Sequence, residues 1–165
     1  MAKNAAVSLF FCQGPIMLHL GQEVGRTKLT PDQTGKVPEV TTNGPIGSGS
    51  DNLVFLVPSP NSYQADNETN YINYNDIKLN QELFYYYRGL IRLRGMEELF
   101  RKSKPEEITI LNAANKNSLG INLKNRIFGF VNTDPSNPAE YEIPQGKYSV
   151  LVNGKSAGTE ELSVI

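Results

Sequence analysis

Residues 15–20, Pro15-Ile16-Met17-Leu18-His19-Leu20, form a short and almost wholly apolar run that Gly21 closes. An apolar run of this length without alternation predicts a strand that is buried on both faces, as in a parallel sheet. Because such a sheet needs helices on both faces, the run indicates an α/β arrangement in this part of the chain.

A short helix is expected before this strand. Ala5, Leu9 and Cys12 recur at helical spacing, and Gly14-Pro15 would end the helix. The same stretch differs from a signal peptide, because a single lysine precedes it and two phenylalanines stand where a cleavage site has small residues. We therefore predict a buried helix, with Cys12 as a small buried apolar residue.

After the strand, the sequence changes from loop to helix. Residues 29–60 hold five prolines and four glycines, which predicts a long loop. Asn80 is suited to cap a helix that runs to about Arg101, and Pro105 marks a boundary beyond it. Leu83, Tyr87, Leu90, Ile91 and Arg94 mark one stripe at helical spacing, and Tyr87 is expected in the core. The charges at its end are expected on a solvated, salt-bridged face, made of Arg92, Arg94, Glu97, Glu98 and Arg101.

From residue 107 onward, apolar and polar residues alternate with a period of two. The alternating segments are Ile108–Ile110, Leu119–Leu123, Ile127–Val131, Tyr141–Ile143, Tyr148–Val152 and Leu162–Ile165. Asn153-Gly154 predicts a hairpin with a type I′ turn. These short segments predict a small antiparallel β-sandwich or barrel.

Composition excludes several classes of function. The chain of 165 residues has 16 Lys and Arg against 17 Asp and Glu, so it lacks the basic excess of a nucleic-acid binder. No apolar run reaches the roughly 18–20 residues that span a bilayer, so no membrane partner is expected. A single cysteine and a single histidine exclude a disulfide framework and a zinc site built from cysteines. We therefore expect no metal site and no cofactor in this chain.

Four stretches, in consistent order and spacing, carry a family resemblance. They are Gln13–Glu23 with Arg26-Thr27-Lys28, Asn61-Ser62-Tyr63 through Tyr74, Phe84–Arg94 with Phe100-Arg101, and Gly146–Gly158. In turn they resemble the eighth barrel strand, the Asn-Ser-Tyr segment, the last barrel helix and the C-terminal β-domain of type I pullulanases. These debranching enzymes belong to the α-amylase superfamily, glycoside hydrolase family thirteen. Leu20, Asn73 and Tyr74 depart from the usual Ala, Asp and Trp.

The resemblance implies that residues 1–105 are the end of a (β/α)8 TIM barrel: its last strand, a long loop and its last helix. Residues 106–165 would then form a small all-β antiparallel sandwich domain. A complete barrel needs about 250 residues, and retaining glycoside hydrolysis needs two carboxylates. In the family these carboxylates lie on earlier barrel strands, so we expect no catalytic residue here and no activity of this chain alone. Calcium, which some relatives bind, is expected at most in the parent enzyme.

The resemblance also implies a substrate-binding segment. The residues expected to line glucose subsites are Asn61, Tyr63, Asp66, Asn67 and Asn70. Amides and carboxylates bond sugar hydroxyls, and tyrosine faces pack against pyranose rings. Without the resemblance, the same stretch indicates an ordinary asparagine-rich turn region. His19, Gln22 and Glu23 would support the site from the strand end, with His19 as a hydrogen-bonded structural histidine.

The expected partners are an α-glucan polysaccharide or oligosaccharide and the remainder of the barrel. A strand at residues 15–20 without its barrel neighbours would expose edges and apolar surface, which predicts self-association. Three roles stay open for the chain: a piece of an α-1,6-acting hydrolase, an independent α-glucan-binding module, or a structural module that stabilises the barrel end.

Overall fold

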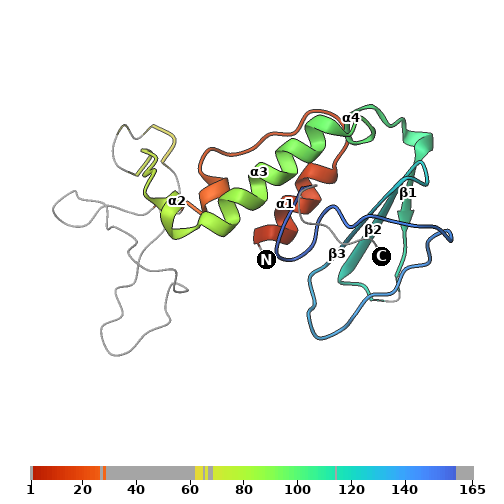
Figure 1. Ribbon diagram of the computed structural model, residues 1–165. Coiled ribbons are helices and arrows are strands. Elements are labelled where there is room, and N and C mark those ends of the chain that lie inside the picture. The colour runs from red at the N-terminus through yellow and green to blue at the C-terminus, as the bar shows by residue number, and fades with distance from the viewer. Residues whose placement is uncertain are drawn as a thin grey trace. The chain divides into compact units, whose positions relative to one another are not determined.

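The computed structural model describes residues 2–26, 28, 62–64, 66, 69–113 and 115–158 (Figure 1). The helices are α1 (Ala2–Phe11), α2 (Asp76–Leu79), α3 (Gln81–Met96) and α4 (Leu99–Lys102), with 3-10 turns η1 (Gln22–Val24) and η2 (Pro105–Glu107). The strands are β1 (Ile108–Leu111), β2 (Ser118–Leu123) and β3 (Ile127–Asn132). The loop predicted over residues 29–60 lies outside the described residues.

The chain divides into two compact units. Residues 1–18 and 85–165 form one, which we call the sheet unit, and residues 19–84 form the other, which we call the turn unit. The division at residue 105 into a barrel part and a β-domain stays a prediction. In the described parts of the chain, no helix has the length and apolar character that crossing a membrane requires.

Helix α1 confirms the predicted N-terminal helix but not its buried face. Ala6, Val7 and Phe10 are buried, whereas Cys12, predicted to be buried, is exposed. Both candidate stripes have helical spacing, so the period alone does not decide between them. The buried face of α1 is set by the elements that it packs against. Helix α1 lies beside β3 (Figure 1), and the ring of Phe10 packs edge to face on the ring of Tyr87, with 6.0 Å between the ring centroids.

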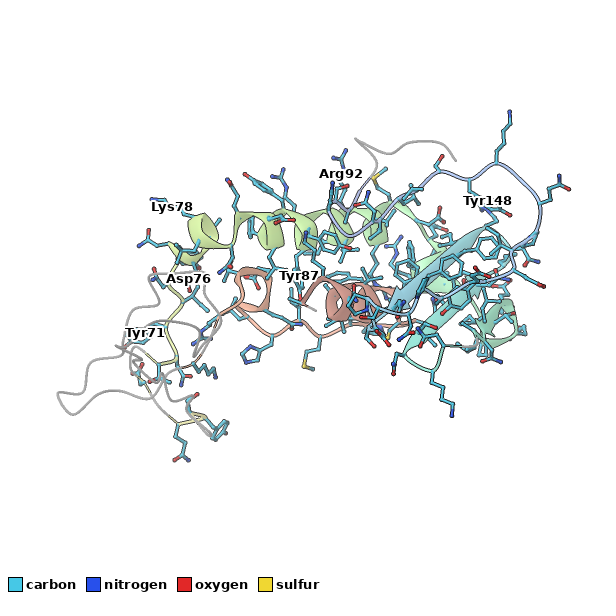
Figure 2. All side chains as sticks on the ribbon, turned by 90° about the horizontal axis from the view of Figure 1, so that it is seen from below. Tyr71, Asp76, Lys78, Tyr87, Arg92 and Tyr148 are labelled. Atoms are coloured by element: carbon cyan, nitrogen blue, oxygen red, sulfur yellow. The ribbon has the colours of Figure 1, made fainter. Side chains whose placement is uncertain are left out.

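Helix α3 begins where the sequence indicates. The carbonyl of Asn80 accepts the first intrahelical bond, from the N–H of Phe84 at 3.0 Å. The prediction of a buried Tyr87 is confirmed, and its ring lies inside the sheet unit (Figure 2). The full buried set is Tyr86, Tyr87, Leu90, Leu93 and Arg94. Ile91, which shares the helical spacing of Tyr87, is exposed, and the helix stops at Met96 instead of near residue 101.

Arg94 corrects the expectation of a solvated, salt-bridged face. Its side chain is only 8% exposed. Its guanidinium donates to the carbonyls of Phe10 and Cys12, both at 2.8 Å, and to the carbonyl of Gly14. Burial lowers the pKa of Arg94. The arginine therefore connects α3 to the end of α1, because it satisfies the Phe10 carbonyl in the last turn of α1 and two carbonyls just beyond that helix.

Three of the predicted strands form one antiparallel sheet in the order β1-β2-β3. Leu123 of β2 pairs with Ile108 on one side and with Ile127 on the other. The turn between β2 and β3 has positive φ at both Lys124 and Asn125, which mirror-image turns require. The sequence prediction placed such a turn at Asn153-Gly154 instead, and neither of these residues has positive φ. The prediction of turn type was wrong there.

One face of the sheet builds the core of the sheet unit. The buried cluster consists of Leu93, Phe100, Leu123 and Ile127. Phe11 of α1 packs edge to face on Phe100, with ring centroids 4.8 Å apart. Gly129 of β3 lies under the Phe11 ring, and a Cβ there would overlap the ring. Helices α1, α3 and α4 thus cover this face.

The opposite face shows no second sheet among the described residues, so the sandwich stays a prediction. Residues 141–143 and 148 form no ladder with a second sheet in the described part of the chain. Instead, Tyr141 lies against Phe130 and Tyr148 against Phe128, with ring centroids 4.6 Å and 5.5 Å apart. The rings of Tyr141 and Tyr148 cover this face of the sheet, and such side-chain packing does not require backbone pairing. The last predicted strand, residues 162–165, lies outside the described residues.

A short hairpin ties both ends of the sheet unit together. Val152 pairs with Ala157, and the N–H of Asn153 donates to the carbonyl of Ser156 at 2.9 Å. The Tyr86 hydroxyl donates to the Asn153 carbonyl at 2.9 Å. From α1, the Lys3 ammonium donates to the carbonyls of residues 154 and 155 at 3.0 and 3.3 Å. It also lies 5.1 Å from the centre of the Tyr86 ring.

The predicted buried strand at residues 15–20 does not form in the described part of the chain. The exposed fractions of Met17 and Leu20 are 89% and 64%. An extended segment becomes a strand only by hydrogen bonding to a neighbour, and the sheet β1-β2-β3 does not extend to it. The apolar run alone therefore did not decide the secondary structure.

Candidate functional site

The asparagine-rich segment of the turn unit is closed at its base by Ser62 and Asn70. The Ser62 hydroxyl donates to Asn70 Oδ1 at 2.8 Å, and Asn70 Nδ2 donates to the Ser62 carbonyl. Lys28 Nζ donates to the buried Ser62 hydroxyl at 3.1 Å. These bonds hold the two ends of residues 62–70 together, so we call this segment the closed loop.

Arg26 connects the end of the extended segment to the closed loop. Its Nη2 donates to the Thr69 carbonyl at 2.9 Å, and its backbone N–H donates to the Gly21 carbonyl at 2.9 Å. Gly21 has φ of 93°, and a Cβ there would lie 2.6 Å from Cδ of Arg26. Glycine is therefore required at the point where the chain turns toward the loop.

The predicted supporting residues lie around this turn. Glu23 accepts a hydrogen bond from the N–H of Gly21 at 3.0 Å, and the N–H of Gln22 donates to the His19 carbonyl at 3.0 Å. Gln22 and Glu23 are half-buried, whereas the side chain of His19 is exposed. His19 was expected to be a hydrogen-bonded structural histidine on a buried strand; its exposed side chain contradicts burial on such a strand, and its structural role stays a prediction. Support of a sugar site by these three residues stays a prediction.

The predicted subsite residues fall into three groups. Tyr63 and Asp66 are exposed, with Tyr63 exposed to 88%. Asn70 uses its amide to close the loop with Ser62. Asn61 and Asn67 lie outside the described residues.

The structure adds one residue that the sequence analysis missed. The Tyr71 hydroxyl donates to Asp66 Oδ1 at 3.4 Å, and Figure 2 labels this side chain in the turn unit. Tyr71 directly follows Asn70 in the same segment, so the asparagine and tyrosine content of this stretch could have indicated it as a candidate.

Asp76, at the start of α2, is another carboxyl group of the turn unit (Figure 2). Burial raises its pKa, and the positive charge of Arg26 lowers it to a smaller extent. In the described residues, no three His, Cys, Asp or Glu side chains come together as metal ligands would. The described geometry offers hydroxyl, amide and carboxylate groups for hydrogen bonding to a neutral polar ligand.

The sequence matches no protein-family model. Among solved structures, the chain is similar to a pullulanase from Bacillus acidopullulyticus, with a TM-score of 0.67 and 20% sequence identity. The match covers 99% of this chain and 18% of the pullulanase, so the chain spans less than one fifth of that protein. The similarity extends over both compact units, and the chain has a pullulanase-like fold.

Proposed function

We propose that this chain is the C-terminal part of a pullulanase-like α-glucan hydrolase and is inactive alone. Its parent would hydrolyse α-1,6 branch linkages of pullulan, starch or glycogen with retention of configuration. The observation that carries the proposal is the fold similarity, which extends over 99% of this chain but only 18% of the pullulanase.

The size of the chain supports its inactivity. A (β/α)8 barrel needs at least about 200 residues, whereas the whole chain has 165. Retaining hydrolysis needs two carboxylates about 5 Å apart, one as nucleophile and one as acid and base. By the family resemblance, both would stand on barrel strands that residues 1–105 do not include.

The turn unit would contribute to glucose subsites of the parent. Tyr63 and Asp66 present exposed side chains on the closed loop, as residues that meet a ligand must. Asn70 would position the loop through its two bonds with Ser62. Asn61 and Asn67 are part of the same proposal through the family resemblance.

A structural role is the second candidate, and the sheet unit supports it. Leu93 of α3 and Phe100 of α4 share a buried cluster with Leu123 of the sheet. The 106–165 region would then stabilise the last barrel helix rather than bind sugar.

Two measurements on the purified chain test these roles. Incubation with pullulan should release no reducing ends, and their release would contradict the proposed inactivity. Gel electrophoresis through immobilised pullulan, with hydroxyethylcellulose as the β-glucan control, should retard the chain only in pullulan. No selective retardation would contradict the glucan-binding part and favour the structural module.

A further inference from the structure

Asn153 and Gly154 stand in the turn of the hairpin, and both are exposed. In the described part of the chain, no other asparagine directly precedes a glycine. A glycine has no side chain that would hinder a close approach to its own nitrogen. The peptide nitrogen of Gly154 is therefore a sterically open neighbour of the Asn153 carboxamide carbon, to which it can bond to close a five-membered ring.

The carboxamide oxygen of Asn153 accepts several hydrogen bonds within the turn. The N–H groups of Lys155 and Ser156 donate to Oδ1 at 2.7 and 2.8 Å, and the Ser156 hydroxyl donates to it at 3.4 Å. Backbone donors at about 2.7–3.1 Å stabilise the negative oxygen that develops in acyl transfer. Attack on the Asn153 carboxamide places negative charge on this same oxygen, so the turn stabilises the intermediate.

The peptide bond between Asn153 and Gly154 is polarised by Tyr86. The Tyr86 hydroxyl donates to the Asn153 carbonyl at 2.9 Å, and a donor on a peptide carbonyl makes the N–H of the same peptide more acidic. Burial raises the pKa of Tyr86 to about 12, so the hydroxyl keeps its proton in mildly alkaline solution. The Lys3 ammonium donates to the Gly154 carbonyl at 3.0 Å, and its positive charge favours a deprotonated nitrogen. Among the described residues, the Gly154 N–H donates no hydrogen bond.

We propose that Asn153 is a modification site, at which the chain deamidates itself through a cyclic imide with Gly154. The Gly154 nitrogen gives up its proton to solvent and bonds to Cγ of Asn153. The bond from Cγ to Nδ2 then breaks, and Nδ2 takes up a proton and leaves as ammonia. Water opens the imide at either carbonyl and yields aspartate or isoaspartate, so the net change is uptake of water and loss of ammonia. This inference does not depend on the proposed function.

Deamidation alters the hairpin that Lys3 and Tyr86 hold. Either product brings a carboxylate into the turn, close to the carbonyls that the Lys3 ammonium binds. Isoaspartate also adds one atom to the main chain, which disturbs the register of the bridge between Val152 and Ala157. Because the Tyr86 and Lys3 bonds reach main-chain carbonyls of this turn, isoaspartate should loosen both.

The test is incubation of the full chain in mildly alkaline buffer, followed by peptide mapping with mass spectrometry. Deamidation raises the mass of a peptide, and chromatography separates its aspartate and isoaspartate forms. Asn43-Gly44, the same dipeptide outside the described residues, is the internal reference. We expect both products at Asn153. The rate at Asn153 relative to Asn43 should fall when urea unfolds the chain, because unfolding removes the donors around Asn153.

Three variants separate the structure from the dipeptide. Tyr86→Phe keeps the ring but removes the donor, so it should slow deamidation at Asn153 roughly fivefold, the equivalent of one hydrogen bond. Lys3→Met removes an exposed charge and should slow the reaction about twofold. Tyr85→Phe is the matched control, because it removes a phenol hydroxyl from the same helix and should leave the rate unchanged. Far-UV circular dichroism verifies that each variant is folded.

Three results would overturn the inference. The first is no mass increase at Asn153 in the folded chain under conditions where Asn153 in the unfolded chain reacts. The second is a rate relative to Asn43 that stays equal or rises in urea. The third is equal rates in Tyr86→Phe and Tyr85→Phe, because the reactivity would then follow from the dipeptide alone.

Discussion

Replacement of Arg94 by methionine should destabilise the sheet unit strongly. The substitution keeps an unbranched chain of similar length but removes every donor. The carbonyls of Phe10, Cys12 and Gly14 then lose the guanidinium at the end of α1. The positive charge also lies at the C-terminal end of α1, where the helix dipole favours a cation.

The magnitude follows from these three bonds. A hydrogen bond to a charged group contributes about 1.5–3 kcal/mol, and bonds that share one side chain do not add fully. Removing the charge also recovers part of its desolvation cost. We expect a loss of about 3–5 kcal/mol, which is large against the roughly 5–15 kcal/mol of a whole domain. Arg94→Lys should fall between, because one ammonium cannot reproduce the planar guanidinium fork.

Equilibrium unfolding in urea measures this loss. Far-UV circular dichroism is the suitable signal, because the chain has no tryptophan to serve as a fluorescent probe. Arg88→Met is the matched control, since Arg88 lies exposed on the same helix. Its free energy of unfolding should change by no more than about 0.5 kcal/mol. Equal stability of the two methionine variants, or full stability of Arg94→Lys, would refute the reasoning.

Two further predictions concern the hairpin and helix α3. A Cβ at Gly89 would overlap the Ala157 carbonyl oxygen, so Gly89→Ala should lower stability by about 1–3 kcal/mol. At Gly95→Ala the new Cβ meets nothing within 4 Å, so this variant should instead raise the free energy of unfolding by up to about 1 kcal/mol. Thermal unfolding measures both changes, and equal melting temperatures of the two variants would contradict both predictions. Burial raises the pKa of Tyr86 to about 12 from 10.0. The folded state therefore retains a proton that the unfolded state loses, and stability should fall as pH rises from 10 toward 12. Ultraviolet titration should show a phenol that ionises late in the natural sequence and that Tyr86→Phe removes; an unchanged high-pH phase in that variant would exclude Tyr86 as its source.

Elements whose residues pair with near neighbours were predictable from the sequence. The alternation in residues 118–131 predicted strands β2 and β3, which are separated by a short turn. The buried Tyr87 followed from helical spacing along α3. In both cases, the local period and the tertiary environment require the same arrangement.

Features decided by distant partners were not predictable. The apolar run at residues 15–20 has the composition of a buried strand, but strand formation depends on a neighbour. Arginine is a residue type usually found at the surface, and the burial of Arg94 depends on carbonyls some eighty residues earlier in the chain. Tyr141 and Tyr148 alternate as in strands while they cover a sheet face with their rings.

The candidate site shows the same limit. The family resemblance indicated Asp66 and Asn70, and both belong to the closed loop. The hydrogen bond of Tyr71 to Asp66 joins residues five apart in the sequence. No sequence period marks such a contact, so only the folded loop reveals it.

The hairpin that binds Lys3 and Tyr86 has a consequence for synthesis. Lys3 bonds carbonyls that lie 151 and 152 residues later in the chain. At about 5–20 residues per second, those carbonyls leave the ribosome roughly 8–30 s after Lys3. The apolar stripe of Ala6, Val7 and Phe10 is covered earlier, once Tyr87 and strand β3 have been synthesised, so α1 gains its apolar contacts before its polar ones.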